Sequence, residues 1–563
     1  MRVLIFHGYL LDGTGSNVYN ARLADALVRL GHEVHLLCQD RHPHEHTFVD
    51  AAGDWDAGVL RVSQLHDGPV EAEAEAGAVA GAGAARGRCT VYRPNIGGLL
   101  PVYVADRYEG IEARAFPECS DDEIGRYIDA NVAAVCELRG SVRPELALAN
   151  HLVMGPVILA RGLQGAVPYA VKVHGSALEY VVKPHPERFL GLAREGLQGA
   201  RGVLVGSRHT AASLWRALDD DGSLARRTRL GPPGVDVQRF APRQPEIAAA
   251  GVRALAAQLR RSAATSARAT GHGEAQAIEH VEAQAIEHGQ ARTASAFARD
   301  EHETAVALEQ LRPDHDALVA FVGKLIVSKG ADLLIASWPL VLERVPRARL
   351  VLVGFGAYRR ALARLRDALA DADMDTAREV ALAGRSLESP SAGVRPLRHL
   401  LAFLEGLRGS ERGRYLHAAR AMRERVVFTG RLEHAELAQL LPACQAVVVP
   451  STFPEAFGMV AAEAAACAAL PISAAHSGLA EVSQELACNV PEQARAWLSF
   501  PVDDGAVRAL AACLLGWLTA PPELRAQTRS GLVGAVRERW SWDGVACGVI
   551  AAARGQLDDL REP

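Results

Sequence analysis

The first forty residues alternate between apolar runs and glycine-containing loops, a pattern that few folds accommodate. Residues 2–7 form an apolar β-type run, residues 11–17 form a Gly/Asp/Ser-rich loop, and residues 18–30 place apolar side chains largely on one helical face. Gly31 ends this helix, and a second apolar run follows at residues 34–38. Strand, loop, helix and strand make a βαβ unit, and strands that are apolar throughout predict a parallel sheet covered on both faces.

Similar units recur along the chain, so the sequence predicts an α/β fold with two Rossmann-like domains in tandem. The further apolar runs are residues 146–149, 169–173, 203–205, 318–322, 349–353, 426–428 and 446–449. A chain of 563 residues is also too long for one ordinary core. We expect the first domain at residues 1–241 and the second at residues 313–520. Residues 521–563 are expected to be helices that pack back on the first domain.

Three segments fit neither predicted sheet. Residues 71–87 are a low-complexity insert in the first domain and are predicted to be flexible. Residues 242–312 join the domains, and the sequence EAQAIEH occurs there twice, at 274–280 and 282–288. Its composition indicates a solvated helix or a disordered insertion rather than a metal site, although His and Glu recur. Residues 387–420 have a mostly helical pattern and are interpreted as an insertion in the second domain.

Composition and charge exclude several classes of protein. The net charge of −5 gives no reason to expect nucleic acid as a partner. Nine scattered cysteines without a C-x-x-C pair argue against a disulfide framework and a structural zinc, and they fit a reducing cytoplasm. No stretch approaches the ~20 apolar residues of a membrane helix. We therefore expect a cytoplasmic protein with no transmembrane segment, and peripheral membrane contact stays open.

Two glutamates, Glu455 and Glu463, lie where an apolar run leads into an Ala-rich helix that is expected to begin near Phe457. Such a loop presents unpaired backbone N–H groups at the carboxyl edge of a parallel sheet, and these suit a phosphate or a sugar hydroxyl. Glu463 lies about two turns into the helix, so the two carboxylates could hold separate hydroxyls of one extended ligand. Taken alone, an E-x7-E spacing is more often an acidic helix start followed by a solvated glutamate.

Two lysines, Lys324 and Lys329, lie in a glycine-bounded loop directly after another apolar run. They can converge on a diphosphate and neutralise the charge that develops on a departing nucleotide, although most such loops seen alone carry only surface lysines. In the first domain, an apolar run ends at His174. The early loop contains Gly13 and Gly15, but it lacks the third glycine of a dinucleotide fingerprint.

Together these motifs resemble the family 4 retaining glycosyltransferases, which have the GT-B architecture of two facing Rossmann-like domains with a deep interdomain cleft. The stretch PSTFPEAFGMVAAEAAACAALP from Pro450 is similar to the family signature, and GKLIVSKG is similar to its G-R-x(4–6)-K-G loop, with Lys324 at the arginine position. Weaker similarities keep the family order: GPPGVD, VLVGFG, FTGRL and HSGLAE. Two departures are Ala468 and Ser477, which stand where the family usually has glycine.

The resemblance implies roles for individual residues. Glu455 would hold hydroxyls of the donor sugar, Glu463 would hold the ribose of the nucleotide, and both lysines would bind the pyrophosphate. His174 would face the donor sugar across the cleft. The other implied donor-binding residues are Gly13, Gly15, Gly323, Arg431, Phe457, Gly458, Met459 and Val460. The implied mechanism is front-face attack, in which the leaving diphosphate helps to deprotonate the acceptor hydroxyl, without a metal.

We therefore expect a retaining glycosyltransferase that moves a hexose-type sugar from a UDP-, GDP- or ADP-sugar to a hydroxyl, with no cofactor. The acceptor is left open between a carbohydrate, a lipid-linked molecule and a small metabolite. One alternative is a sugar phosphorylase or hydrolase on the same fold. Another is an NAD-dependent oxidoreductase, for which Gln39-Asp40 is a partial match. Retention of both glutamates and both lysines argues against a third, a non-catalytic sugar-binding relative.

Overall fold

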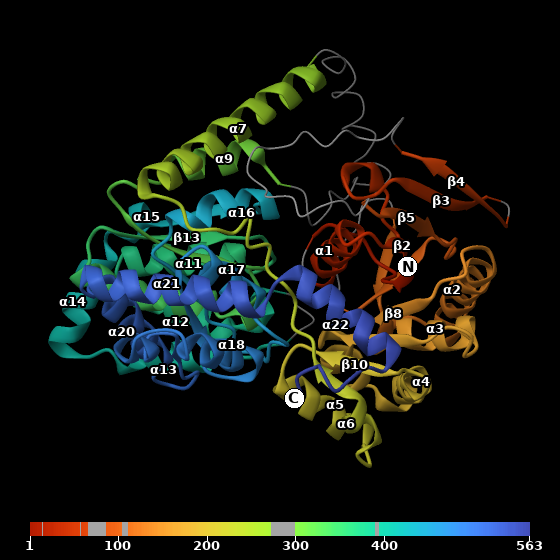
Figure 1. Cartoon of the computed structure of the whole chain (residues 1–563). Helices are drawn as coiled ribbons and strands as arrows, with labels where there is room; N and C mark the ends of the chain where they lie inside the picture. The colour runs from red at the N-terminus through yellow and green to blue at the C-terminus, as the bar shows by residue number, and fades with distance from the viewer. Residues whose placement is uncertain (14, 57, 66–85, 104–110, 272–298, 389–392) are drawn as a thin grey trace, which may run out of the picture. The chain divides into compact units, whose positions relative to one another are not determined.

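The computed structural model describes residues 1–13, 15–56, 58–65, 86–103, 111–271, 299–388 and 393–563, without the side chains of 266–271. The chain divides into two compact units (Figure 1). Unit 1 comprises Met1–Gly234 and Trp540–Pro563, and unit 2 comprises Val235–Arg539. Each unit is built on a largely parallel sheet, as the sequence predicts.

Unit 1 contains a nine-stranded sheet in the order β11-β10-β9-β8-β1-β2-β5-β3-β4. Its strands are β1 (Arg2–Phe6), β2 (Glu33–Leu37), β3 (Ala51–Asp56), β4 (Val59–Gln64), β5 (Arg88–Arg93), β8 (Leu146–Asn150), β9 (Tyr169–Val173), β10 (Gly202–Val205) and β11 (Thr228–Leu230). Only the β3–β4 pairing is antiparallel among the described strands of this sheet. The strand order reverses at β1, which has β2 on one side and β8 on the other. A separate pair consists of β6 (Leu99–Val102) and β7 (Glu112–Ala115).

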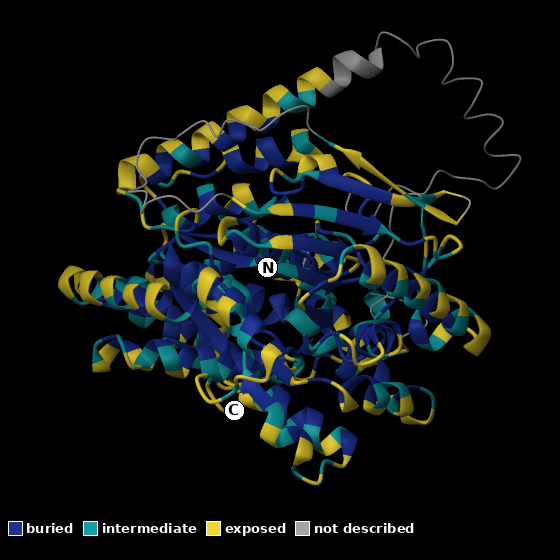
Figure 2. Cartoon of the chain, turned by 45° about the vertical axis from the view of Figure 1, so that its right-hand side comes forward, coloured by how far each residue is buried: buried dark blue, intermediate teal, exposed yellow. Residues whose placement is uncertain are grey.

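Helices cover both faces of this sheet. They are α1 (Ser16–Arg29), α2 (Asp121–Ser141), α3 (Gly155–Leu163), α4 (Pro186–Gln198), α5 (Arg208–Leu218), α6 (Ser223–Arg227) and α22 (Trp542–Arg554). Leu4 and Phe6 of β1 belong to one hydrophobic cluster, whereas Val3 and Ile5 belong to the other, which also contains side chains of α1 and α22. Alternate residues of a strand point to opposite faces, so residues 3–6 of β1 are all apolar because both faces are buried. Figure 2 marks buried residues in dark blue.

Unit 2 contains a six-stranded parallel sheet in the order β14-β13-β12-β15-β16-β17. The strands are β12 (Ala317–Val322), β13 (Ala348–Val353), β14 (Val426–Gly430), β15 (Ala446–Val449), β16 (Leu470–Ala474) and β17 (Ser499–Phe500). The order reverses at β12, between β13 and β15. The helices are α7 (Pro245–Gly271), α9 (Glu301–Glu309), α10 (Ala331–Arg344), α11 (Arg359–Ala370), α12 (Met374–Ala383), α13 (Arg398–Gly406), α14 (Gly409–Ala419), α15 (Met422–Arg425), α16 (His434–Leu440), α17 (Met459–Ala466), α18 (Ser477–Ala487), α19 (Glu492–Arg495), α20 (Ala506–Leu518) and α21 (Pro522–Arg539).

The two units divide the chain differently from the predicted domains. Helices α7 and α9, inside the segment predicted as a linker, pack against each other and belong to unit 2. Val252, Leu255 and Leu259 of α7 are buried, because apolar residues recur every three to four positions in this Ala-rich stretch. Of the predicted C-terminal helices, α21 belongs to unit 2 and α22 to unit 1. Both copies of EAQAIEH and most of residues 71–87 lie outside the described residues.

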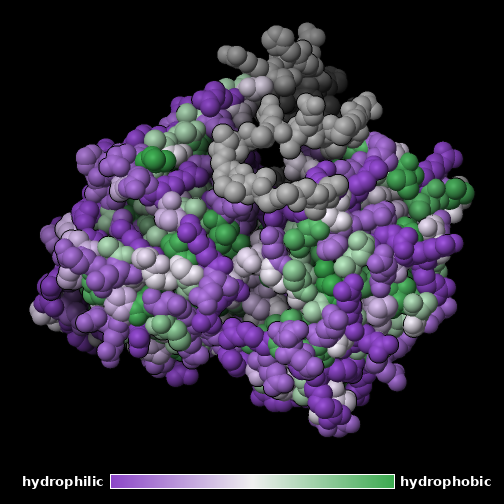
Figure 3. Space-filling model, in the orientation of Figure 1, coloured by the Kyte–Doolittle hydropathy of each residue, from purple (hydrophilic) through white to green (hydrophobic). Residues whose placement is uncertain are grey.

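The surface carries hydrophilic residues over both units on the face shown in Figure 3. Within the described ranges, none of the helices combines the length and the apolar character that a bilayer span requires.

Candidate functional site

Two loops of unit 2 contact each other after the neighbouring strands β12 and β15. The backbone N–H of Thr452 donates to the carbonyl oxygen of Ser328 at 2.9 Å. A Cβ atom on Gly330 would lie 2.0 Å from the carbonyl oxygen of Pro450, and the φ of Gly330 is 66°. Glycine is therefore required here both by the close approach and by the left-handed backbone. Because the strand order reverses at β12, this carboxyl edge is where open α/β sheets bind ligands.

Lys329 and Glu455 form an ion pair between these two loops. Nζ of Lys329 donates to Oε1 of Glu455, and the hydroxyl of Ser451 donates to the same oxygen at 2.6 Å. Burial by itself raises the pKa of Glu455, but the charge of Lys329 and these two hydrogen bonds outweigh burial and lower that pKa. Glu455 is therefore a carboxylate at neutral pH. Its second oxygen, Oε2, has no hydrogen bond to any described residue.

The backbone of Glu455 is held by the loop that follows β16. Its N–H donates to Oγ of Ser477 at 2.9 Å, and its carbonyl oxygen accepts from the N–H of Gly478 at 2.9 Å. His476 donates from Nε2 to the carbonyl oxygen of Ser451 at 2.8 Å. The φ of Ser477 is 53°, in the left-handed region that L-residues rarely adopt. Ser477 stands where the family usually has glycine. Its hydrogen bond to the Glu455 N–H therefore offsets the cost of its strained backbone.

Glu463 lies in the second turn of α17 and is 5% exposed. Its Oε1 accepts a hydrogen bond from Nε2 of His434 at 2.7 Å, and the rings of Phe240 and His434 pack in a T-shaped arrangement with centroids 4.6 Å apart. The helix begins at Met459, two residues after the predicted start at Phe457. Among the described residues no side chain caps its N-terminus, so its first N–H groups remain for a ligand.

The other predicted donor-binding residues of unit 2 lie at the same edge of the sheet. Gly323 and Lys324 follow β12, and a Cβ on Gly354 would lie 1.8 Å from the carbonyl oxygen of Gly323. Arg431 follows β14 and pairs with Glu433 at 2.9 Å. Phe457 is buried; the partly exposed residues at the start of α17 are Gly458, Met459 and Val460.

The predicted His174 of unit 1 has two histidine neighbours that sequence reasoning missed. His7, His151 and His174 follow the adjacent strands β1, β8 and β9. The rings of His151 and His174 lie 4.9 Å apart, and those of His7 and His151 lie 6.2 Å apart. A shared signal is present in the sequence, since each histidine directly follows an apolar strand, in LIFHG, ALANH and VKVHG. The sequence does not show that the three histidines lie close together, because that depends on β1, β8 and β9 being neighbours in the sheet.

The surroundings of His174 disfavour its positive charge. Burial lowers the pKa of His174 well below its usual value, and His151, Lys172 and His7 lower it further. Lys172 is itself buried, and burial lowers its pKa to about 7. Its Nζ donates to the carbonyl oxygen of Gly231 at 2.5 Å.

The predicted glycines Gly13 and Gly15 flank residue 14, which lies outside the described residues. Gly15 has a φ of 59° and precedes α1, a conformation that favours glycine. Nearby, Asp40 accepts hydrogen bonds from the N–H of Leu11 at 2.8 Å and of His42 at 2.9 Å. Both of its oxygens are therefore committed to the backbone, which weakens the alternative in which the Gln39-Asp40 pair would bind the ribose of NAD.

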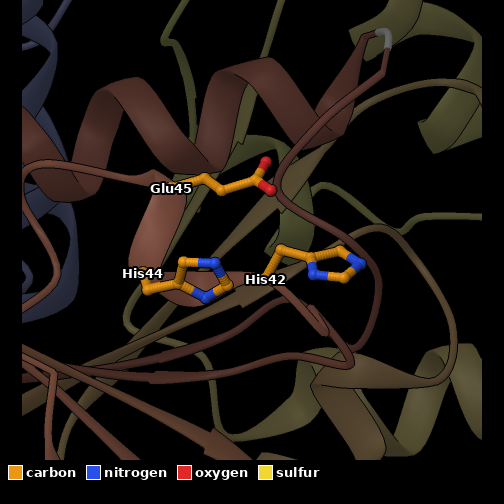
Figure 4. A group of neighbouring side chains, drawn as sticks. All are labelled: His42, His44 and Glu45. Carbon is orange, nitrogen blue, oxygen red and sulfur yellow. The ribbon is translucent and has the colours of Figure 1, made fainter. Parts of the chain in front are cut away.

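Two groups of described residues bring several metal-ligating atoms within 4.8 Å of one another. One consists of Asp12, Asp40 and His46. The other consists of the exposed His42, His44 and Glu45, in and beside the short 3₁₀ turn that follows β2 (Figure 4). Neither group contains a residue predicted for transfer, and the metal independence of the reaction stays a prediction.

Comparison with known proteins gives a family match for residues 406–526, to the family described as glycosyl transferases group 1. This range includes Arg431, Glu455 and Glu463. A curated relative is the D-inositol 3-phosphate glycosyltransferase of Segniliparus rotundus, which is 28% identical over 242 residues. The similar region covers 43% of this chain, and it spans 40% of the length of that relative. Both names are those of glycosyltransferases, the class that the sequence predicts.

Solved structures of similar fold cover nearly the whole chain. The sucrose-phosphate synthase of Thermosynechococcus elongatus has a TM-score of 0.51 at 18% identity and covers 99% of both chains. Anabaena HepE, solved with UDP and glucose, has a TM-score of 0.50 at 15% identity and also covers 99% of both chains. These likenesses confirm the predicted fold class of two Rossmann-like domains and, with the family match, the predicted resemblance. The deep interdomain cleft stays a prediction.

Proposed function

Because residues 406–526 form a group 1 glycosyl transferase domain on this fold, we propose that the chain transfers a sugar from a nucleotide-sugar donor with retention of configuration. The sugar is of the hexose type, and the receiving group is an acceptor hydroxyl. The observation that carries the proposal is the Lys329–Glu455 ion pair at the carboxyl edge of the sheet in unit 2. It joins a phosphate-binding cation to a sugar-binding carboxylate.

Glu455 is suited to hold hydroxyls of the donor sugar. Its Oε1 is occupied by Lys329 and Ser451, which keep it ionised and restrict its rotation, while Oε2 remains to accept from a ligand. A hydrogen bond to a charged acceptor is stronger than a neutral one, so an ionised Glu455 holds a hydroxyl firmly.

Lys329 is suited to bind the diphosphate, together with Lys324 of the same loop and the first N–H groups of α17. A helix N-terminus and two ammonium groups stabilise the negative charge that grows on the leaving diphosphate. Since Lys329 also contacts Glu455, the same ammonium links the sugar and phosphate ends of the donor. Glu463, oriented by His434, would accept from the ribose hydroxyls.

The names of the similar proteins indicate where testing should begin. HepE binds UDP and glucose, which supports UDP-glucose as the first donor to assay, before GDP- and ADP-sugars. The curated relative takes its name from D-inositol 3-phosphate, which supports a small phosphorylated metabolite as the first acceptor. A carbohydrate and a lipid-linked acceptor follow. We propose transfer without a metal or cofactor, in the cytoplasm.

The test is a panel of UDP-, GDP- and ADP-sugars assayed for transfer and for slow hydrolysis, with wild type and Glu455→Ala. We expect Glu455→Ala to lose at least about 100-fold in donor turnover, because a substrate loses a hydrogen bond to a charged group. A matched control is Glu485→Ala, which removes a similarly half-buried carboxylate paired with Arg539 in the same unit. The control should keep its activity.

Wild-type activity in Glu455→Ala, with the control also active, would refute the assignment. The phosphorylase alternative predicts a different result: no nucleotide stabilises the protein in thermal unfolding, and inorganic phosphate supports formation of a sugar phosphate.

A further inference from the structure

A buried chain of polar side chains in unit 1 ends on His174. It runs from His7 through Asn20 and Asn150, which are 1%, 0% and 1% exposed. His7 follows β1, Asn20 lies on α1, Asn150 ends β8, and His174 follows β9. Each link is a hydrogen bond. Nearby backbone carbonyl groups can only accept, so they identify which side-chain atom of each link is the donor.

The first link determines which nitrogen of His7 carries the proton. Nε2 of His7 lies 2.9 Å from the carbonyl oxygen of Leu10 and 3.1 Å from Oδ1 of Asn17. The amide nitrogen of Asn17 donates to the carbonyl oxygen of Asp12 at 2.7 Å, so the atom that faces His7 is its oxygen. Both neighbours of Nε2 are acceptors, and Nε2 therefore carries the proton. Nδ1 of His7 is left as an acceptor.

The next links determine how the two asparagine amides are turned. Nδ2 of Asn20 donates to Nδ1 of His7 at 3.0 Å and to the carbonyl oxygen of Ser16 at 2.8 Å. Nδ2 of Asn150 donates to Oδ1 of Asn20 at 2.7 Å and to the carbonyl oxygen of Phe6 at 3.2 Å. A backbone carbonyl can only accept, so neither amide can be flipped without losing a buried hydrogen bond.

The last link reaches His174. With Nδ2 of Asn150 committed as a donor, its Oδ1 faces Nε2 of His174 at 2.8 Å and accepts the proton of that nitrogen. In the described part of the chain Nδ1 of His174 has no hydrogen-bond partner, and the residue is partly exposed. The Tyr19 ring packs against the His174 ring in a T-shaped arrangement, with centroids 4.9 Å apart, and this contact restricts the rotation of His174.

We propose that the His7–Asn20–Asn150 chain holds His174 as a neutral imidazole whose unprotonated Nδ1 accepts a hydrogen bond from a substrate hydroxyl. His7, Asn20 and Asn150 are then positioning residues. In this state His174 neither donates a proton to a leaving group nor brings a positive charge to the diphosphate. The role in substrate binding rests on the proposed function, whereas the protonation of His174 does not.

The groups around His174 agree with a neutral ring. The Tyr19 ring contacts His174, and the ammonium group of Lys172 lies over that Tyr19 ring. The His151 ring also contacts His174, and a charge on His151, Lys172 or His7 disfavours a charge on His174. Both ring nitrogens of His151 are buried without a partner among the described residues, so a proton on His151 would be costly as well. Among the described residues no carboxylate pairs with His174, so no negative charge offsets the loss of its solvation.

The protonation is measured directly by nitrogen-15 NMR of the full chain labelled at histidine. The signals of His174 are assigned by their loss in His174→Gln. At pH 7.5 we expect a protonated Nε2 and an unprotonated Nδ1. A proton on Nδ1, alone or together with Nε2, would overturn the proposal. This spectrum requires no activity, so a chain that transfers no sugar but shows this state would refute the proposed function and the substrate contact of Nδ1, and would leave the inferred protonation of His174 standing.

The dependence on the chain is tested by Asn150→Asp, with Asn131→Asp as the matched control. Asn131 is 1% exposed and donates to the carbonyl oxygen of Tyr127 on the same helix, and within the described residues it has no hydrogen bond to a histidine. A carboxylate at residue 150 still accepts from Nε2 and stabilises the imidazolium, while its other oxygen faces two acceptors, Oδ1 of Asn20 and the carbonyl oxygen of Phe6, which lowers the stability of the fold. We expect both nitrogens of His174 to be protonated at pH 7.5 in Asn150→Asp and not in the control.

The kinetic readout separates positioning from a structural effect. In Asn150→Asp the acceptor at Nδ1 is lost, so we expect at least a tenfold fall in kcat/KM for the donor that is partly recovered as the pH is raised. Asn131→Asp should keep the wild-type pH profile. An unchanged His174 spectrum in Asn150→Asp would contradict the role of the chain. If Asn150→Asp does not fold, the wild-type spectrum alone decides the proposal.

Discussion

Two positions at which this chain departs from the family glycine, Ala468 and Ser477, should respond in opposite ways to restoring that glycine. Ala468 has a φ of 63° and Ser477 a φ of 53°, so both backbones are in the left-handed region. The side chains differ, since the methyl group of Ala468 cannot hydrogen-bond, whereas Oγ of Ser477 accepts from the N–H of Glu455. The pair therefore separates the cost of backbone strain from the value of one hydrogen bond.

The size of each effect follows from these contacts. A non-glycine residue in the left-handed region is disfavoured by roughly 1–2 kcal/mol. A glycine also lowers the stability of the folded chain by about 0.5–1 kcal/mol, because it gives the unfolded chain more conformational freedom. Ala468→Gly should therefore stabilise the folded chain by about 0.5–1 kcal/mol. In Ser477→Gly the same strain is relieved, but an unsatisfied N–H of Glu455 costs roughly 1–3 kcal/mol, and we expect net destabilisation.

The assay is thermal unfolding of the full chain, with donor turnover measured on the same samples. Ala468→Gly should raise the unfolding midpoint and leave turnover unchanged. Ser477→Gly should lower the midpoint and reduce turnover, because Glu455 loses the contact that holds its backbone. An equal rise of the midpoint in both variants would refute the reasoning, since it would mean that the Ser477 hydroxyl contributes nothing.

Three further outcomes are expected. Burial, with the nearby charge of Glu388, raises the pKa of Asp332 to about 7. Between about pH 4 and pH 7 the folded chain therefore keeps a proton on Asp332 that the unfolded chain releases. The free energy of unfolding falls as the pH rises through this range. Asp332→Asn should remove this fall. The free energy of unfolding of Asp332→Asn minus that of wild type, measured in urea, should therefore grow by about 2–3 kcal/mol between pH 5 and pH 8. A difference that does not change with pH would contradict the raised pKa of Asp332. His434→Phe removes the hydrogen bond that orients Glu463, so the KM for the nucleotide sugar should rise about tenfold with little change in kcat, and a fall in kcat alone would count against a ribose role. Lys324→Arg should lower the KM for the donor a few-fold, because a guanidinium binds phosphate with two parallel hydrogen bonds. If calorimetry shows that the variant binds UDP more weakly than wild type, residue 324 does not contact the diphosphate.

Much of the candidate site in unit 2 could be predicted from the sequence because of how parallel sheets are built. All strands of such a sheet end at one edge, so a residue that follows an apolar run must lie near the residues that follow the others. Glu455, Lys324 and Lys329 were predicted in this way, and the family resemblance supplied their roles. Helices α7 and α9 were not predicted as part of a domain, because a composition rich in Ala, Glu and Arg suits a solvated helix and a packed one equally well.

The order of strands was beyond sequence reasoning, and the order decides which side chains touch. Glu455 pairs with Lys329 because β15 lies beside β12, although 126 residues separate the two side chains in the chain. The three histidines of unit 1 meet because β1, β8 and β9 are adjacent, and only His174 was singled out in the sequence.

The sequence by itself determined the strand–loop–helix repeat, the two Rossmann-like domains, and the residue types available at the strand ends, because these depend on local periodicity and on residues close together in the chain. The tertiary structure alone decided that Glu455 is held ionised by Lys329 and Ser451, and that the Ser477 hydroxyl supports the Glu455 backbone. It also decided that a line of buried amides reaches His174. Ionisation and tautomer depend on burial and on hydrogen-bond partners, and those partners come from strands that only the folded sheet places side by side.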